Sequence, residues 1–157
     1  MNLIESTKTC LTKYFVFSGR ASRSEFWWFQ LFVMILTFVG LSLDALLIFG
    51  SYEKSLESEL VISFTNVLGL SMLIPIYSVF FRRLHDVNRS GWWIVASYSF
   101  IIFASILADN EALLETNILF LMLFFLLVGI VLTFIIVYWC IKKGDVSSNK
   151  YGSKPVK

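Results

Sequence analysis

The chain of 157 residues is too apolar to lie wholly in water: 57% of its residues are hydrophobic and only 15% are charged. A soluble domain carries about a quarter charged residues, so this sequence lacks the polar side chains that a water-exposed surface needs. A net charge of only +2 excludes proteins that bind nucleic acid through a strongly basic overall charge. The composition predicts an all-α integral membrane protein.

The first 25 residues are predicted to form a cytoplasmic segment at the membrane interface. Its apolar side chains recur near one face at helical spacing: Leu3, Ile4, Leu11, Tyr14 and Phe15. This pattern is typical of a short amphipathic helix that lies in the interface. Ser22 and Glu25 stand three residues apart just before a long apolar run, so we expect them to cap the next helix reciprocally.

Four apolar stretches follow, at about residues 26–49, 60–81, 92–108 and 118–141. About 20 residues of helix cross a hydrocarbon core about 30 Å thick, and each stretch reaches or approaches that length. Short connections favour antiparallel neighbours. We therefore predict a four-transmembrane-helix bundle, with residues 1–157 as a single membrane domain.

Details of the spans give further expectations. The first span is expected to stop near Leu43 and leave Asp44 in the headgroup region. Gly40, Gly69 and Gly129 are expected to be points of close packing between helices.

The basic residues predict the orientation. The N-terminal segment, the middle connection and the tail, residues 142–157, hold 12 of the 13 lysines and arginines. The other two connections hold Lys54 and six acidic residues: Glu53, Glu57, Glu59, Asp109, Glu111 and Glu115. By the positive-inside rule, both termini are cytoplasmic and the acidic connections face outward.

The stretch "FFRRLHDVNRSGWW", residues 80–93, carries the densest chemistry, including the single histidine. All five arginines lie here or in "SGRASRSEFWW", whereas the tail uses only lysine. Arginine holds carboxylates and phosphates with a planar fork, and lysine cannot. The segregation predicts that the two motifs meet in fixed contacts, with Glu25 and Asp86 as internal partners, and that the tail folds over them.

The motifs "FSGRASRSEFWW", "RRLHDVNRSGWW" and "NKYGSKP" resemble the bacterial inner-membrane family catalogued as domain of unknown function 805, the YhaH-like proteins, over about Tyr14 to Pro155. The resemblance places the family's characteristic residues at these positions: Gly19, Arg20, Arg23, Glu25, Trp27, Arg83, Leu84, His85, Asp86, Ser90, Gly91, Trp92, Asn149, Tyr151, Gly152 and Pro155. The chain departs from the family in the tail, where "DVSS" precedes Asn149. The resemblance implies a small multi-span protein of the bacterial inner membrane and supplies no activity.

Two interpretations of the arginine-rich motif remain open. In the first it is a loop that orients the chain: Arg82 and Arg83 reach toward the headgroups, His85 and Asp86 bond loop backbone, Gly91 allows the turn, and Trp92 anchors the next span. In the second it binds anionic lipid headgroups or another ligand. The candidate binding residues are Arg20, Arg23, Arg82, Arg83, His85, Arg89, Asn149 and Tyr151, with Glu25, Asp86, Gly91 and Trp92 as structural partners.

The function we predict is organisation of the bundle together with binding of anionic lipid or a partner protein, which could be another membrane protein or a second copy. The alternatives are a transporter or channel subunit that acts as an oligomer, and a membrane enzyme that uses His85 and Asp86 on a phosphate-bearing lipid. We expect no enzyme activity, no cofactor and no nucleic-acid partner. We also expect no metal site, because one histidine and two separated cysteines cannot form a usual zinc site.

Overall fold

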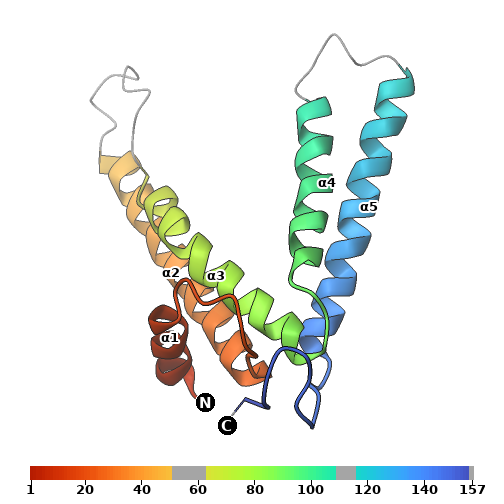
Figure 1. The fold of residues 1–157 in the computed structure, drawn as a ribbon. Coiled ribbons are helices and arrows are strands. Elements are labelled where there is room, and N and C mark those ends of the chain that lie inside the picture. The colour runs from red at the N-terminus through yellow and green to blue at the C-terminus, as the bar shows by residue number, and fades with distance from the viewer. Residues whose placement is uncertain (51–62, 109–115, 156–157) are drawn as a thin grey trace. The chain divides into compact units, whose positions relative to one another are not determined.

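The computed structural model describes residues 1–50, 63–108 and 116–155, and these residues form five helices (Figure 1). They are α1 (Leu3–Thr12), α2 (Arg23–Gly50), α3 (Phe64–Asp86), α4 (Trp92–Ala108) and α5 (Thr116–Ile141). Within those ranges the extended structure amounts to one isolated bridge between Asn149 and Gly152. The all-α prediction is confirmed. A helix satisfies its own backbone hydrogen bonds, so a long apolar helix can lie in the hydrocarbon core of a bilayer, where no water is available to bond the backbone.

The predicted spans agree with four of these helices, with differences at their ends. The third predicted span coincides with α4, and α5 begins two residues before the fourth. Three helices are long and apolar enough to cross a membrane, over Arg23–Leu47, Phe64–Asp86 and Ile118–Ile141, and α4 is a shorter apolar helix. Lys54, the six acidic residues of the two connections predicted to face outward and residues 60–62 of the second predicted span lie outside the described residues.

The chain divides into two compact units. The first comprises Met1–Phe17 and Ser24–Val79, and the second comprises Ser18–Arg23 and Phe80–Val156. The first unit thus holds α1, nearly all of α2 and most of α3. The second holds the end of α3 together with α4, α5 and the tail.

Helix α1 turns only part of its surface toward the rest of the first unit. Asn2 caps it: the backbone N–H of Glu5 donates to Asn2 Oδ1 over 2.9 Å, and the Glu5 carboxylate accepts from the backbone of Asn2 over 3.2 Å. Ser6 and Cys10 are buried, whereas Ile4 is 78% exposed. Part of the apolar face expected to enter the membrane interface is therefore left uncovered by the described residues.

The segment after α1 forms hydrogen bonds with α3 near the proline that interrupts the backbone hydrogen bonding of α3. Pro75 lies inside α3 and has no backbone N–H, so the carbonyl of Ser71, four residues earlier, loses its helical donor. The hydroxyl of Tyr14 donates to this carbonyl. One turn further on, Ser78 Oγ donates to the carbonyls of Lys13 and Val16 over 2.9 and 2.7 Å.

Asp44 has a structural role at the start of α3. Helix α2 continues past Leu43 to Gly50, and the end of the membrane span near Leu43 stays a prediction. The Asp44 carboxylate accepts from the backbone N–H groups of Phe64 and Thr65 over 2.7 and 3.1 Å, and from the hydroxyl of Ser63. These are the free donors at the start of α3, and a carboxylate there also suits the helix dipole.

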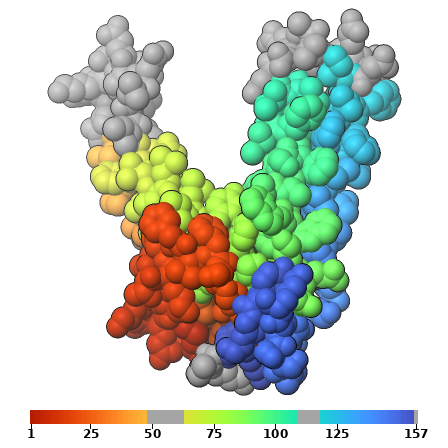
Figure 2. Space-filling view, in the orientation of Figure 1, coloured from red at the N-terminus to blue at the C-terminus, as the bar shows by residue number. Residues whose placement is uncertain are grey.

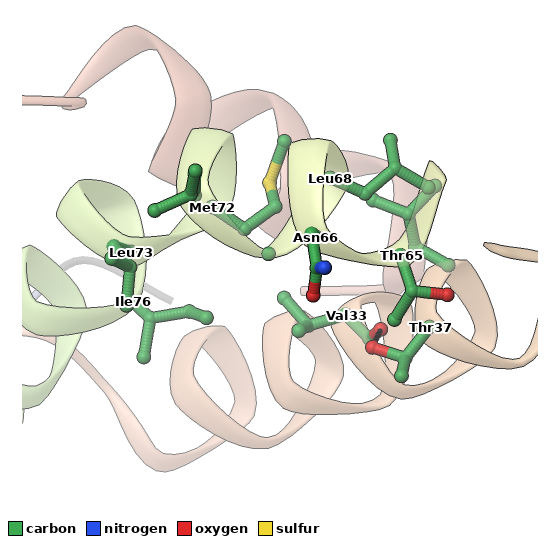
Figure 3. A pocket seen from close by; sticks show the side chains of 11 residues that line it. Val33, Thr37, Thr65, Asn66, Leu68, Met72, Leu73 and Ile76 are labelled. Carbon is green, nitrogen blue, oxygen red and sulfur yellow. Dashed lines mark hydrogen bonds between the residues drawn. The ribbon is translucent and has the colours of Figure 1, made fainter. Parts of the chain in front are cut away.

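A groove of about 690 Å³ lies between α2 and α3 (Figure 3). Its lining is mostly aliphatic, with Thr37, Thr65 and Asn66 as the polar contributions. Gly40 packs against α3 as expected, since an added Cβ would lie 3.1 Å from Thr65 Oγ1. Gly69 lines the groove and has no atom within 4 Å of an added Cβ among the described residues, so its prediction as a packing point is wrong.

In the second unit, α4 and α5 lie side by side as an antiparallel pair (Figure 1). Ser97 Oγ donates to the carbonyl of Gly129 over 3.1 Å and lies 2.8 Å from Thr133 Oγ1. An added Cβ at Gly129 would lie 2.6 Å from the side chain of Ile101, which confirms Gly129 as a close-packing point. Small residues of this kind let apolar helices approach and bond across the interface.

The contact between Tyr14 and Ser71 gives a first prediction. Tyr14→Phe removes the donor from a carbonyl that Pro75 has left without a helical partner, so we expect a loss of about 1 kcal/mol, or a few degrees in the thermal unfolding midpoint. Unfolding in detergent measures this loss. Tyr138→Phe is the matched control, since the Tyr138 ring is 62% exposed on α5. Equal midpoints for the two variants would show that Tyr14 does not support α3.

Candidate functional site

The end of α3 places the arginine-rich motif. The helix closes with Asn88 in the left-handed region at φ 57°, the N–H of Arg89 donating to the carbonyl of Leu84 and that of Asn88 to the carbonyl of His85. This double closure satisfies the last helical carbonyls. Arg82, Arg83, His85 and Asp86 therefore lie on the last turns of α3, so the interpretation of the motif as a loop is wrong at these residues, although His85 does contact loop backbone.

One carboxylate joins the two arginine motifs. Asp86 Oδ1 lies 2.9 Å from both Nε and Nη2 of Arg20, and Oδ2 accepts from Nη1 of Arg83. The side chains of Arg20, Arg83 and Asp86 are 1%, 0% and 6% exposed. We call these three residues the arginine clasp. Their contact confirms the expectation that the two motifs meet.

Arg20 directs its remaining donors at the backbone of the tail. Nη1 donates to the carbonyls of Ser147 and Gly152 over 2.7 and 3.3 Å, and Nη2 donates to the carbonyl of Asp145 over 2.6 Å. Four N–H groups of this guanidinium thus donate to oxygen atoms, and Nη2 also forms an ion pair with Asp86. An ammonium group has only three donors at one point, so lysine could not make this set of contacts.

Arg83 ties α3 to the end of α5. Its Nε donates to the carbonyl of Cys140 over 3.1 Å, and its Nη2 donates to the carbonyl of Lys142. The last carbonyls of a helix have no partner within the helix, so Arg83 acts as the C-terminal cap of α5.

The tail folds back over the clasp through His85, as expected. The ring of Tyr151 stacks on that of His85, with 3.8 Å between the ring centroids and 8° between the ring planes. Asn149 Nδ2 donates to the His85 carbonyl over 2.9 Å. His85 also contacts the segment before α2, because its Nδ1 atom lies 3.1 Å from the carbonyl oxygen of Gly19. The space-filling view shows the tail, in dark blue, as a compact lobe (Figure 2). His85 and Asp86 thus contact different partners, and they do not pair as a catalytic dyad would.

Gly144 was missed by sequence reasoning. An added Cβ would lie 1.9 Å from Oδ2 of Asp86, so only glycine lets the chain pass the carboxylate. The backbone N–H of the next residue, Asp145, donates to the carbonyl of Asp86 over 2.9 Å. A glycine three residues after the end of a long helix, as in "KKGD", is the signal that could have indicated a fixed backbone here.

Three further basic residues of the candidate site lie around the clasp. Arg82 is 1% exposed, and its carbonyl accepts from the N–H of Ala21 over 2.9 Å. Arg23 and Arg89 are exposed, and the guanidinium of Arg89 lies 5.0 Å from the ring centroid of Trp139. The expectation that Arg82 and Arg83 reach out toward headgroups is wrong, because both side chains are buried.

The remaining expected partners are Glu25, Gly91 and Trp92, and the role of Glu25 as a partner of the arginines stays a prediction. Glu25 belongs to the first unit, is 4% exposed and lies 3.9 Å from the thiol of Cys10. The start of α2 at Arg23 agrees with Ser22 as its cap, and its reciprocal bonds with Glu25 stay a prediction. Gly91 fits against the ring of Phe81, where a Cβ would lie at 2.1 Å, and Trp92 is 69% exposed. Among the described residues no group of three metal-ligating side chains occurs.

With this geometry in place, comparison with known proteins identifies the family. A family model described as "Protein of unknown function (DUF805)" matches residues 14–153. The chain belongs to the DUF805 family. The match includes the arginine clasp and every tail residue that contacts it, so the family relationship covers the whole candidate site.

Two curated relatives come from Escherichia coli strain K12. The chain is 42% identical to "Inner membrane protein YhaH" over 83 residues, which are 53% of this chain and 64% of the relative. It is 34% identical to "Inner membrane protein YhaI" over 83 residues, 53% of this chain and 62% of that relative. Each alignment thus spans less than two thirds of the relative. No solved structure matches the chain.

The clasp gives a second prediction, on fork geometry. Arg83→Lys keeps the charge but leaves the carbonyl of Cys140 or Lys142 without its donor, so we expect a loss of about 1–3 kcal/mol in the free energy of unfolding. Lys143→Arg is the matched control, because Lys143 is exposed. Thermal unfolding of the two variants measures the difference. Equal shifts would mean that only the charge at position 83 matters.

Proposed function

We propose that this DUF805 protein is an integral protein of the inner membrane with four spans and both ends on the same side. The contact between Arg20, Asp86 and the tail carbonyls carries the proposal. Arg20 precedes α2, Asp86 ends α3, and the tail follows α5. Residues in direct contact lie on one side of a membrane. The chain between Arg20 and Asp86, which holds α2 and α3, must therefore cross the membrane an even number of times, and so must the chain between Asp86 and the tail, which holds α4 and α5.

Helix α4 then has to cross as well. The apolar stretch in α5 is 24 residues long, enough for a full span, and its end returns to the clasp. At about 1.5 Å per residue, the 17 residues of α4 extend about 25 Å, which is close to the thickness of the hydrocarbon core. The distribution of lysine and arginine supports the cytoplasm as the side of the clasp.

Topology is the third prediction, and labelling of single cysteines measures it. We expect a cysteine at Ser55 to react with a membrane-impermeant maleimide added outside the cell. A cysteine at Ser148, in the exposed tail, should react only after the membrane is opened. Both native thiols, Cys10 and Cys140, are buried and give the background signal. Labelling of Ser148→Cys from outside would contradict the proposed orientation.

We further propose that the cytoplasmic side of the second unit binds anionic lipid headgroups and, through the clasp, organises the bundle. The clasp arginines direct their donors at protein oxygens, so surface cations must supply the attraction. The described residues of this unit carry six exposed cations: Arg23, Arg89, Lys142, Lys143, Lys150 and Lys154. The acidic residues described there are Asp86, which is buried, and Asp145, which is partly exposed. An excess of this kind near a membrane surface attracts anionic lipid.

Lipid binding is the fourth prediction. Each cation near an anionic surface contributes about 1 kcal/mol, so Lys142→Gln/Lys143→Gln/Lys154→Gln should weaken retention of phosphatidylglycerol by about 3 kcal/mol, or about a hundredfold. Native mass spectrometry of the purified protein measures bound lipid. The matched control replaces the same three lysines with arginine and should retain the lipid. Equal retention in both variants would turn the search for a ligand toward partner proteins.

A further inference from the structure

We propose that residues 145–152 of the tail form a displaceable strap over an oxyanion site on Arg20. A phosphate group occupies this site when the strap opens, in place of the tail carbonyls. The inference deepens the proposed function, on which it rests for a lipid headgroup as the source of phosphate. A free phosphate ion has the same chemistry, and the experiment below separates the two sources.

The charge of the clasp favours an anion over the strap. Arg20 and Arg83 share the single carboxylate of Asp86, so these three side chains carry one formal positive charge in excess. The oxygens that complete the guanidinium contacts are backbone carbonyls, which are dipoles without net charge. A buried charge is stabilised best by an opposite charge with matching hydrogen bonds, and a phosphate supplies both.

The geometry of Arg20 keeps the site in place when the strap leaves. Asp86 binds the edge formed by Nε and Nη2, and the strap carbonyls bind Nη1 and the second hydrogen of Nη2. Loss of the strap therefore frees three N–H groups, including the edge between Nη1 and Nη2. Two phosphate oxygens fit such an edge as a bidentate pair. Asp86 continues to hold the guanidinium in orientation.

The strap itself is lightly held. Apart from the contacts with Arg20, it is fixed by the stack of Tyr151 on His85, the bond from Asn149 to the His85 carbonyl and the N–H of Asp145 on the carbonyl of Asp86. Val146, its one aliphatic residue, is 71% exposed. A segment with little apolar burial opens at low free energy.

One amide of the strap reports its opening directly. The N–H of Asp145 donates to the carbonyl of Asp86, outside the strap, over 2.9 Å, whereas the N–H groups of Asn149, Tyr151 and Gly152 donate to oxygens within the strap. The full chain is placed in nanodiscs of phosphatidylcholine alone, of phosphatidylcholine with phosphatidylglycerol, and of phosphatidylcholine with inorganic phosphate in the buffer. Hydrogen exchange is then followed by mass spectrometry.

We expect the amide of Asp145 to exchange about tenfold faster when the anion stands at about ten times its dissociation constant for the open form. Acceleration with phosphatidylglycerol alone identifies a headgroup as the source, and acceleration with inorganic phosphate shows that a free anion suffices. Unchanged or slower exchange with both anions overturns the inference.

Two variants test whether Arg20 is the site. Arg20→Lys keeps the charge and loses the fork, so the acceleration by anion should disappear. Tyr151→Ala removes the stack on His85 without altering Arg20, so the strap should open at a lower anion concentration than in the wild type. If Arg20→Lys does not fold, an unaltered anion response in Tyr151→Ala is enough to reject the strap.

The lipid-retention measurement separates this inference from the proposed function. If the protein retains phosphatidylglycerol but hydrogen exchange is unchanged with both anions, lipid binding is supported and the displaceable strap is rejected. If inorganic phosphate accelerates exchange but no lipid is retained, the oxyanion site is supported and lipid binding is rejected. Absence of both effects rejects both proposals.

Discussion

Two guanidinium groups share the carboxylate of Asp86, and three parts of the second unit depend on that arrangement. Arg20 brings the segment before α2 to the end of α3, and Arg83 brings the end of α5 to the same point. Without the carboxylate, two like charges would remain buried beside each other, and breaking a buried ion pair in this way costs about 3–5 kcal/mol. The carboxylate thereby fixes the place where the tail can fold.

The clasp recognises the tail mainly through its backbone. Arg20 binds the carbonyls of Asp145, Ser147 and Gly152, and these oxygens are present whatever the side chains are. The closure of the tail over the clasp therefore depends little on the side chains of "DVSS". Side chains matter where the tail contacts His85, through Asn149 and Tyr151, and at Gly144, where no Cβ fits beside Asp86.

Each helical pair also satisfies polar groups that lipid would leave without partners. In the first unit, Tyr14 donates to the carbonyl freed by Pro75, and Asp44 accepts from the start of α3. In the second unit, Ser97 bonds to the backbone of α5 beside Gly129. A polar group in hydrocarbon has no water to bond, so such contacts fix which faces of the helices meet.

The sequence by itself determined the helices, because the length and apolarity of a segment decide whether it can span a bilayer, and these properties are local. It also predicted that the arginine motifs meet at Asp86 and that Asn149 and Tyr151 return to them, since charge and fork chemistry are visible in side chains. Only the tertiary structure decided that α3 stays helical through Asp86 and that Arg20 binds three particular carbonyls. It also decided that the backbone at Gly144 lies against the Asp86 carboxylate and that Gly69 lines a groove. Those features depend on the path of the backbone between distant residues, and backbone oxygens are the same at every position of a sequence.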